Sequence, residues 1–250
     1  MKNKRSHYAR KVVKTIHEEG FMVFARKAFR FFRRTIVRRI ELKLLSNFYI
    51  WGFHRVYYYS SVWTNTSFFG VPVQKCPLDL WIYQEIIFET KPDFIIETGT
   101  SKGGSALFFA SICELINQGQ VITIDIKKQD IPLHPRITRI VGNSVSEEVI
   151  QKVEKIVGSQ RAMVVLDSAH EKEHVLKEIE LYNKFVQKGD YLIVEDTDIN
   201  GHPVRPEFGH GPMEAVETFL KKIEDFTIDS KREKFMLTSC PKGFLKRIRQ

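Results

Sequence analysis

Short apolar runs alternate with longer amphipathic segments along most of the chain. The runs predict buried strands at 94–96, 121–126, 137–141, 162–166 and 191–194. Apolar residues that recur every three or four positions predict helices over 77–90, 104–117, 146–157, 171–187 and 212–222. Strands and helices alternating at these lengths predict an α/β fold with a doubly wound, mostly parallel sheet. A late strand is expected at 235–238, before a turn at 241–243.

A basic amphipathic helix is predicted within residues 7–45. Apolar side chains recur there at helical spacing and basic ones lie mostly on the other side, although Arg39 interrupts the apolar side. The apolar set is Phe21, Ala25, Phe29, Phe32, Ile36 and Ile40, and the basic set is Arg26, Arg30, Arg33, Arg34 and Arg38. This helix can lie on an anionic membrane surface, or it can pack on the protein's own core or on a second copy. Both alternatives stay open, and so does homo-oligomerisation.

The net charge of +9 comes from this N-terminal segment. Residues 1–45 hold 14 Lys or Arg and 3 acidic residues, so the remaining chain, with 25 basic and 27 acidic residues, is nearly neutral. A nucleic-acid substrate is therefore disfavoured for the main domain. The three cysteines lack metal-binding spacing, and charges interrupt the first 40 residues, so we expect a reducing compartment and no signal peptide. The expected location is cytoplasmic, either soluble or peripheral to a membrane.

An uncharged, aromatic-rich run covers residues 56–74. It contains Ser, Thr, Asn, Gly and Pro, which make it too polar for a transmembrane helix. Its aromatic side chains could form a lid over a substrate, although covering the core is the commoner role of such residues.

The stretch 97–105, Glu-Thr-Gly-Thr-Ser-Lys-Gly-Gly-Ser, follows the first strand and opens a helix. Its glycines allow a tight turn and a close backbone approach to a ligand. Ser105 and Ala106 stand where a phosphate-binding loop has Lys-Ser or Lys-Thr, which disfavours a triphosphate. A carboxylate at the strand end, Glu97, suits a ligand with amine or sulfonium charge such as S-adenosylmethionine. The alternative is a glycine turn that binds nothing.

Acidic residues follow the other predicted strands. Asp125 ends the second strand, 28 residues beyond Glu97, and this position favours a ribose-hydroxyl acceptor over a solvated aspartate. Asn143 or Ser144, after the third strand, could contact adenine or cap the next helix.

The fourth and fifth predicted strands end in Asp167 and in Glu195-Asp196. Ligands of doubly wound sheets bind beyond the carboxyl ends of the strands, so these acids should converge on one crevice. Carboxylates held close together repel one another unless they are protonated, paired or bound to a cation. An all-oxygen cluster of the three suits Mg²⁺. Alternatively, the acids cap helices or pair with Lys172 or Arg205.

Four motifs in this chain resemble the cephalosporin hydroxylase family. They are the stretch 97–105, Leu-Asp-Ser-Ala-His-Glu-Lys-Glu-His-Val-Leu at 166–176, Gly-Asp-Tyr-Leu-Ile-Val-Glu-Asp-Thr at 189–197, and Asn-Gly-His-Pro-Val at 200–204. The resemblance runs from about 63 to 247 and implies a class I, Rossmann-like S-adenosylmethionine-dependent methyltransferase, similar to rhamnosyl and sugar O-methyltransferases. It implies a methyltransferase-like domain over 63–250, with an antiparallel edge pair late in the sheet. The basic amphipathic helical extension and aromatic linker expected over 1–62 lie outside the resemblance.

The resemblance also implies roles for individual residues. It implies a cofactor site of Glu97, Gly99, Ser101, Gly104, Ser105 and Asp125, and a Mg²⁺ site of Asp167, Glu195 and Asp196. In the similar catechol enzymes a lysine base follows the aspartate by three positions, and here His170 has that place. His170 keeps a base but changes its pKa range. His174, His202 and Arg205 are candidates for the acceptor pocket or for surface roles.

The expected reaction is metal-dependent transfer of the S-adenosylmethionine methyl group to a hydroxyl of a sugar or another small molecule. Two other interpretations remain at this stage. The protein could take part in cephalosporin hydroxylation or methoxylation, although the chain shows no convincing facial triad for iron. It could also be a non-catalytic, membrane-peripheral module that binds S-adenosylmethionine. A nucleic-acid methyltransferase is disfavoured because no Asn-Pro-Pro-Tyr motif occurs.

Overall fold

The computed structural model describes residues 20–33, 35 and 38–249. The chain separates into two compact units, Met1–Gly52 and Phe53–Gln250. The predicted N-terminal helix corresponds to α2 (Phe21–Phe32) and the start of α3 (Arg38–Tyr59). Its part at 7–19, with Arg34 and Ile36, lies outside the described residues. Helix α3 continues further than expected and runs past residue 52 into the second unit, so the predicted boundary after residue 62 falls inside that unit.

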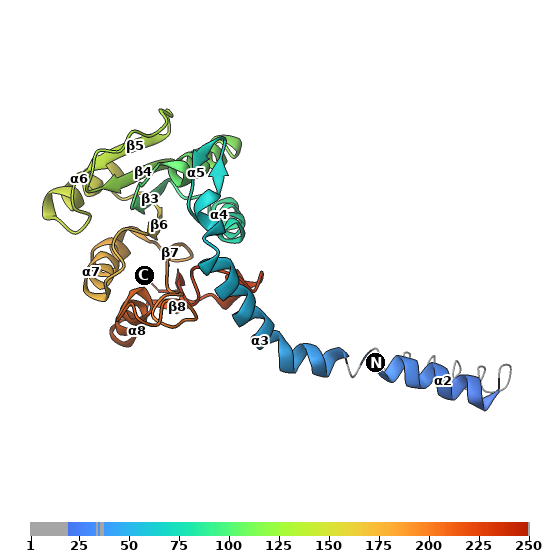
Figure 1. Cartoon of the computed structure of the whole chain (residues 1–250). Coiled ribbons are helices and arrows are strands. Elements are labelled where there is room, and N and C mark those ends of the chain that lie inside the picture. Colours follow the sequence, from blue (N-terminus) through green and yellow to red (C-terminus); the bar gives the residue numbers. More distant parts are fainter. Residues whose placement is uncertain (1–19, 34, 36–37, 250) are drawn as a thin grey trace. The chain divides into compact units, whose positions relative to one another are not determined.

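The second unit is built on a seven-stranded sheet with the order β5-β4-β3-β6-β7-β9-β8 (Figure 1). The strands are β3 (Phe94–Thr98), β4 (Gln120–Asp125), β5 (Ile137–Val141), β6 (Ala162–Leu166), β7 (Tyr191–Val194), β8 (Phe226–Ile228) and β9 (Phe244–Arg247). The first five are parallel, whereas β9 runs antiparallel to both β7 and β8. The predicted doubly wound, mostly parallel sheet is therefore confirmed.

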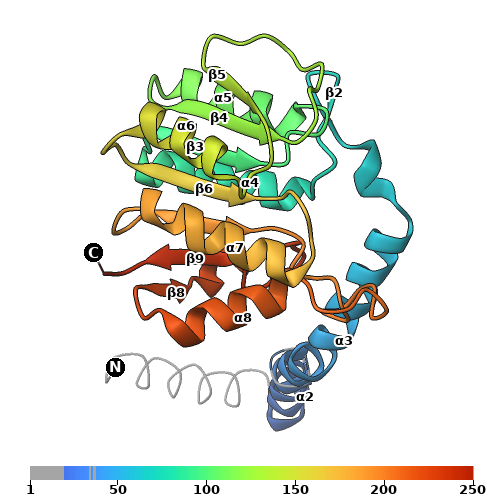
Figure 2. The same cartoon turned by 90° about the vertical axis from the view of Figure 1, so that its left-hand side faces the viewer.

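Helices cover both faces of this sheet (Figure 2). Helices α6 (Glu147–Val157), α7 (Lys172–Tyr182) and α8 (Pro212–Lys222) pack on one face, and α4 (Pro77–Thr90) and α5 (Gly104–Leu115) pack on the other. Helix α7 is shorter than predicted, because η3 (Asn183–Phe185) replaces its last turn. Successive strand residues pack against opposite helix layers. Ile96 packs on the α6–α8 side and Ile95 on the α4–α5 side. Burial on both faces explains why the strands are continuous apolar runs.

The antiparallel pair at the sheet edge forms from different residues than predicted. The strand expected at 235–238 is wrong, since Met236 has a φ of +69°, which an extended strand does not allow. The pair consists of β8 and β9. The basic residues Lys246 and Arg247 concealed β9 in the sequence, but their side chains lie over the rings of Tyr191 and Phe226 at 5.4 and 5.3 Å. These contacts let a charged edge strand cover aromatic surface.

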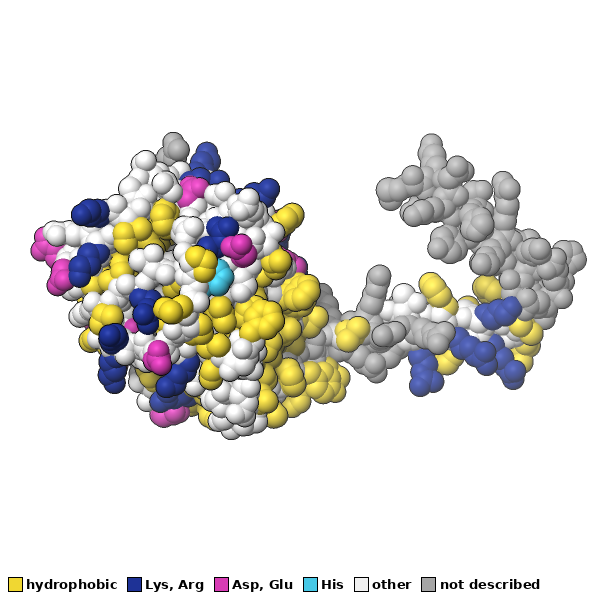
Figure 3. Space-filling view, turned by 90° about the horizontal axis from the view of Figure 1, so that it is seen from above, with side chains coloured by type: hydrophobic (Ala, Val, Ile, Leu, Met, Phe, Trp, Pro, Cys, Tyr) yellow, Lys and Arg dark blue, Asp and Glu magenta, His cyan; other side chains and the backbone are white. Residues whose placement is uncertain are grey.

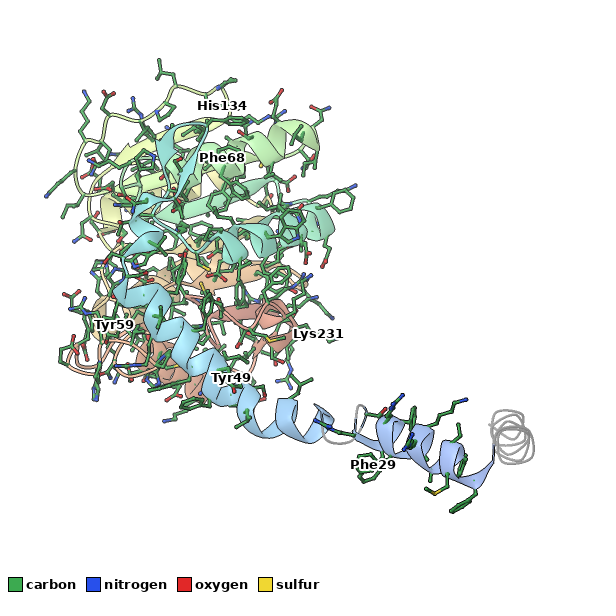
Figure 4. The ribbon with its side chains drawn as sticks, turned by 45° about the vertical axis from the view of Figure 1, so that its right-hand side comes forward. Phe29, Tyr49, Tyr59, Phe68, His134 and Lys231 are labelled. Carbon is green, nitrogen blue, oxygen red and sulfur yellow. The ribbon has the colours of Figure 1, made fainter. Side chains whose placement is uncertain are left out.

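The aromatic run at 56–74 is divided between several elements. It includes the end of α3, η2 (Val62–Asn65) and a hairpin of β1 (Ser67–Phe68) and β2 (Val71–Pro72). The ring of Phe68, labelled in Figure 4, contacts Phe108 of α5 edge-on at 5.3 Å, so this part covers the core, whereas Phe69 is exposed. Among the described residues, no helix combines the length and apolar character that a membrane span requires.

Helix α5 offers a matched test of this packing. Phe109 is fully buried against the sheet, whereas Leu115 on the same helix is 82% exposed. We expect Phe109→Ala to lower the free energy of unfolding by about 3–5 kcal/mol, because it leaves a cavity in the core. Leu115→Ala should change it by less than about 0.5 kcal/mol. Urea unfolding followed by circular dichroism measures both, and equal effects would contradict the assigned faces.

Candidate active site

The candidate site lies at the carboxyl ends of β3, β4, β6 and β7. These strands are neighbours in the sheet, and the chain reverses its direction of winding at β3, first adding β4 and β5 and then crossing to β6. Such a switch point leaves a crevice beyond the strand ends. Gly99, Asp125, Asp167 and Glu195 directly follow or end the four strands, as predicted.

The turn after β3 requires glycine at position 99. Gly99 has a φ of +88°, and its amide donates to the carbonyl of Ile124 at 2.8 Å. A Cβ atom at this position would lie 1.8 Å from the carbonyl oxygen of Asp167. Backbone from two neighbouring strand ends therefore meets where only a hydrogen atom fits.

At the start of α5, a second glycine lies in close contact with the backbone of another segment. A Cβ on Gly104 would lie 2.3 Å from the carbonyl oxygen of Pro72, so this glycine admits the β1–β2 hairpin. Gly104 and Ser105 are both buried at the first turn of α5. The structure thus gives Gly104 a packing role, and a role in cofactor binding stays a prediction.

Asp125 ties the glycine turn to the end of β4. Its Oδ2 accepts the backbone N–H of Ser101 at 3.0 Å, and its Oδ1 accepts that of Lys127 at 2.9 Å. The Ser101 hydroxyl lies 3.2 Å from Oε1 of Gln74. These bonds fix the carboxylate at the crevice, where each oxygen keeps a second lone pair for a ligand.

A cavity of about 210 Å³ opens beside Asp125. It brings together the residues that sequence analysis placed at the ribose and adenine ends of a nucleoside. Its lining is Gly99, Ile124, Asp125, Ile126, Gly142, Asn143, Ser144, Ser168, Ala169 and His174. Of the six predicted cofactor residues, Gly99 and Asp125 line it, whereas Glu97, Ser101, Gly104 and Ser105 lie behind it or in the turn.

His174 also lines this cavity, next to Ser144. Its Nε2 lies 3.2 Å from the Ser144 hydroxyl and 3.6 Å from Oε1 of Glu178, which is fully buried. Hydrogen bonding to Glu178 raises the pKa of His174. The Ser168 hydroxyl also donates to Glu178, at 2.7 Å. His174 is a candidate for the acceptor pocket from its sequence position, but it lies in the cavity with the residues assigned to a nucleoside.

Glu97 is fully buried within β3. Its Oε2 accepts the hydroxyl of Thr123 at 2.7 Å, and Thr100 hydrogen-bonds to that same hydroxyl. Its Oε1 is buried and has no hydrogen-bond partner among the described residues. Burial raises the pKa of Glu97 to about 6, although the charge of Lys75 opposes the shift. An acceptor with a missing donor would be satisfied by an ammonium group.

A buried lysine joins two of the predicted metal ligands. Lys75 Nζ donates to Asp167 Oδ2 at 2.5 Å and to Glu195 Oε1 at 2.6 Å. Tyr83 of α4 donates to the same Oε1 at 2.8 Å. Burial opposes the ammonium charge, but Asp167 and Glu195 raise the pKa of Lys75 well above its usual value. Neither Lys172 nor Arg205, the partners considered from the sequence, makes this contact.

A second group of ligand atoms lies on the open side of Asp167. One atom each from Asp167, His170 and Asp196 lies within 4.8 Å of the others, and all three side chains are half-buried. His170 Nε2 is 3.4 Å from Asp196 Oδ2. Burial, Asp167 and Asp198 raise the pKa of Asp196 well above its usual value. This repulsion is what a bound cation would relieve.

The end of α3 contacts the segment that follows β7, which the sequence pattern did not indicate. His54 is buried, and its Nε2 lies 2.8 Å from Oδ2 of Asp198, two residues after Asp196. One residue further, Arg55 Nη1 donates to the carbonyl of Pro203 at 2.9 Å. The Tyr59 hydroxyl, labelled in Figure 4, accepts the amide of Arg205 at 2.9 Å. The helix was expected to end near residue 45, so no signal connected its residues with the site.

The remaining acceptor-pocket candidates contact neighbouring acids. His202 Nε2 lies 3.0 Å from Oε1 of Glu214, which also accepts the side-chain amide of Asn200 at 3.0 Å. Arg205 lies 3.5 Å from Glu207. These contacts tie the segment after β7 to α8, and a role of His202 or Arg205 in the acceptor pocket stays a prediction.

The sheet order and the crevice at β3 define an α/β protein of the class I methyltransferase fold. Comparison with known proteins identifies its family. The sequence matches the family described as Rhamnosyl O-methyltransferase/CmcI over residues 60–248. A rhamnosyl O-methyltransferase of Mycobacterium bovis (strain BCG / Pasteur 1173P2) is 39% identical over 204 residues, covering 77% of this chain and 82% of that protein. One of Mycobacterium leprae (strain TN) is 37% identical over 201 residues, covering 77% and 88%.

The chain therefore belongs to the rhamnosyl O-methyltransferase/CmcI family, which confirms the resemblance seen in its motifs. Among solved structures, the CmcI apo-structure matches with a TM-score of 0.59 at 19% identity, covering 75% of this chain and 78% of that one. CmcI with Mg and SAM matches with a TM-score of 0.58 at 20% identity, covering 74% and 77%. At these identities the two structures support the fold.

The buried carboxyl of Asp79 gives a pH-dependent test of the packing of α4 behind the site. Its carboxylate is buried in α4 and accepts the amide of Ser239 at 2.8 Å, and burial raises its pKa to about 7. The folded state therefore holds this proton more tightly than the unfolded state. The protonated Asp79 carboxyl makes its full contribution to the free energy of unfolding below about pH 4. This contribution is lost as pH rises towards 7.

We expect Asp79→Asn to gain stability relative to the wild type as pH rises from about 4 to about 7, by at most about 4 kcal/mol. Urea unfolding across this range measures the difference. Asp130→Asn, at an exposed position, should follow the wild-type curve. A constant difference between Asp79→Asn and the wild type would contradict the assignment.

Proposed function

We propose that this protein is a Mg²⁺-dependent O-methyltransferase that transfers the methyl group of S-adenosylmethionine to a sugar hydroxyl, of the rhamnosyl type. One observation carries the proposal. The Gly99 turn packs against the backbone of Asp167, and the Asp167 side chain belongs to the half-buried group with His170 and Asp196. A cofactor in the crevice and a cation at the acids would therefore lie next to each other, as methyl transfer to an activated hydroxyl requires.

The residues present fit the cofactor. We assign Asp125 to the ribose hydroxyls, and Asn143 and Ser144, which line the same cavity, to the adenine side. Glu97 does not line the cavity, but its Oε1 lacks a donor within the described part of the chain, and we assign this oxygen to the ammonium of the methionine part. The turn lacks the lysine that a triphosphate would need after its last glycine.

The residues present also fit a hard cation. We assign it to Asp167, Asp196 and Glu195, since carboxylate oxygens are the ligands that Mg²⁺ prefers. Lys75 and Tyr83 both bond to Oε1 of Glu195, so its Oε2 is the oxygen assigned to the ion. Bound there, Mg²⁺ would lower the pKa of an acceptor hydroxyl and fix its position.

His170 is the residue assigned to take the hydroxyl proton. Its ring is half-buried beside the acids, with Nε2 3.4 Å from Asp196 Oδ2, which brings a basic nitrogen next to the proposed cation site. A nitrogen ligand is a poor choice for Mg²⁺, so His170 is free for proton transfer although its Nε2 lies near the carboxylates. Lys75 limits the repulsion among the acids from the buried side.

The substrate class rests on the relatives. The rhamnosyl O-methyltransferases of Mycobacterium bovis and Mycobacterium leprae share 39% and 37% identity with this chain across most of their length. This supports a sugar acceptor rather than a β-lactam, because the CmcI structures are below 25% identical and bear on the fold alone.

The Gly99 turn gives a test of cofactor binding. We expect Gly99→Ala to weaken S-adenosylhomocysteine binding at least about 10-fold, because the new Cβ would clash with Asp167. Gly189→Ala is the matched control, since Gly189 has a similar φ of +96° but nothing within 4 Å of the added Cβ. Calorimetric titration measures both variants. Equal affinities in the two variants would remove the turn from the cofactor site.

Asp167 gives a test of the cation. Asp167→Asn removes one carboxylate charge at nearly constant volume, and we expect Mg²⁺ affinity to fall at least about 100-fold and methyl transfer to fall with it. Glu173→Gln, at an exposed position of α7, is the charge-matched control. Mg²⁺ calorimetry and transfer of labelled methyl to a rhamnoside measure the two effects. Unchanged Mg²⁺ affinity would refute the metal assignment, whatever the acceptor.

A further inference from the structure

Helix α2 separates its side chains into two faces. Phe21, Phe24, Phe29, Phe31 and Phe32 gather on one face, together with two alanines. The opposite face holds Arg26, Lys27 and Arg30, and Arg33 follows at the end of the helix. No acidic residue occurs between 20 and 33. Figure 3 shows the basic side chains of α2 in dark blue next to hydrophobic ones in yellow.

The apolar face of α2 is exposed to solvent. Phe21, Phe29 and Phe31 are each about two thirds exposed, at 67%, 65% and 68%, and α2 has no buried residue. Figure 4 shows Phe29 extending outward from the helix. A run of large aromatic side chains in water is costly, so this face is expected to be covered by something when the protein works.

The middle of α3 also exposes large aromatic side chains. Residues 44–53 contain no charged side chain, and Phe48, Tyr49 and Trp51 are 64%, 64% and 48% exposed. Tyr and Trp side chains favour the boundary between water and lipid, where the apolar ring and the polar tip are both accommodated. Over their described residues, neither α2 nor α3 is long and apolar enough to cross a membrane.

The basic residues of α2 indicate which kind of partner covers its apolar face. A second copy of the chain would bring two basic helices together, and like charges repel. A nucleic acid would use the basic face but would leave five phenylalanines in water. An anionic lipid surface satisfies both faces, because the phenylalanines enter the boundary of the acyl chains while the arginines meet lipid phosphates.

We propose that α2, together with residues 45–52 of α3, binds the surface of anionic membranes and lies parallel to it. This inference concerns the first compact unit and goes beyond the methyl-transfer activity, which depends on the second. The binding is peripheral. Its strength comes from apolar burial and electrostatic attraction together, so it requires both faces of α2.

The test uses the full chain and two kinds of vesicle, phosphatidylcholine alone and phosphatidylcholine with an equal part of phosphatidylglycerol. Co-sedimentation across a salt series measures affinity. We expect binding to the phosphatidylglycerol vesicles that weakens as salt increases, and at least about 10-fold weaker binding to phosphatidylcholine alone. Absence of binding to both kinds, or equal binding to both, overturns the proposal.

Matched double variants separate the two faces. Arg26→Gln with Arg30→Gln should weaken vesicle binding about 30-fold, and the loss should shrink at high salt. The control, Lys188→Gln with Lys221→Gln, removes two exposed charges from the second unit and should bind as the wild type does. Circular dichroism and S-adenosylhomocysteine titration check that each variant is folded.

The apolar pair distinguishes lipid from other partners. Phe29→Ala with Phe32→Ala should weaken vesicle binding at least about 10-fold at every salt concentration, since alanine keeps the helix but removes the aromatic burial. Leu115→Ala with Leu133→Ala, both exposed in the second unit, is the control. Unchanged vesicle binding in the phenylalanine pair overturns the proposal in favour of a polyanion. A concentration-dependent dimer that this pair abolishes, without vesicle binding by the wild type, overturns it in favour of a second copy.

Discussion

The ammonium group of Lys75 lies between Asp167 and Glu195, and the site depends on this interaction. A parallel sheet of this topology brings the acids that follow β6 and β7 to one edge, where burial makes their mutual repulsion expensive. One buried lysine 2.5 and 2.6 Å from the two carboxylates offsets that repulsion from the inside. Asp196 and the outer side of Asp167 then remain for a second positive charge. The proposed cation would supply that charge.

Asp167 connects the two halves of the proposed chemistry. Its carbonyl oxygen meets the Gly99 turn, its carboxylate bonds to Lys75, and it shares the open cluster with His170 and Asp196. A shift of the Asp167 backbone would therefore disturb the Gly99 turn, the salt bridge to Lys75 and the group of acids with His170 at the same time. Rigid strand ends suit such a site, because methyl transfer tolerates little error in the alignment of donor and acceptor.

Much of the fold could be predicted from the sequence because the strands are apolar runs between glycines, prolines and charged residues. The ranges 137–141, 162–166, 191–194 and 212–222 match β5, β6, β7 and α8 at both ends. The failures have physical causes. Strand β9 lies at the sheet edge and carries basic residues that cover aromatic rings, so its composition resembled a solvated terminus.

For the site, sequence position identified the acids at the strand ends, because the end of a parallel strand is fixed in space by the sheet. It did not identify Lys75, His54 or the cavity position of His174, because their contacts join segments distant in the chain. The acids at the strand ends did indicate that protonation, pairing or a cation was needed, but the partners considered were Lys172 and Arg205 rather than Lys75. Long-range side-chain pairing of this kind has no local pattern.

The most direct test of the central claim is calorimetric titration of the full chain with S-adenosylmethionine and Mg²⁺, each alone and each in the presence of the other. We expect saturable one-to-one binding of S-adenosylmethionine and saturable binding of Mg²⁺, both in the crevice beside Asp167. We also expect that each ligand changes the affinity of the other by the same factor, as linkage requires. Absence of S-adenosylmethionine binding under every condition would contradict the account.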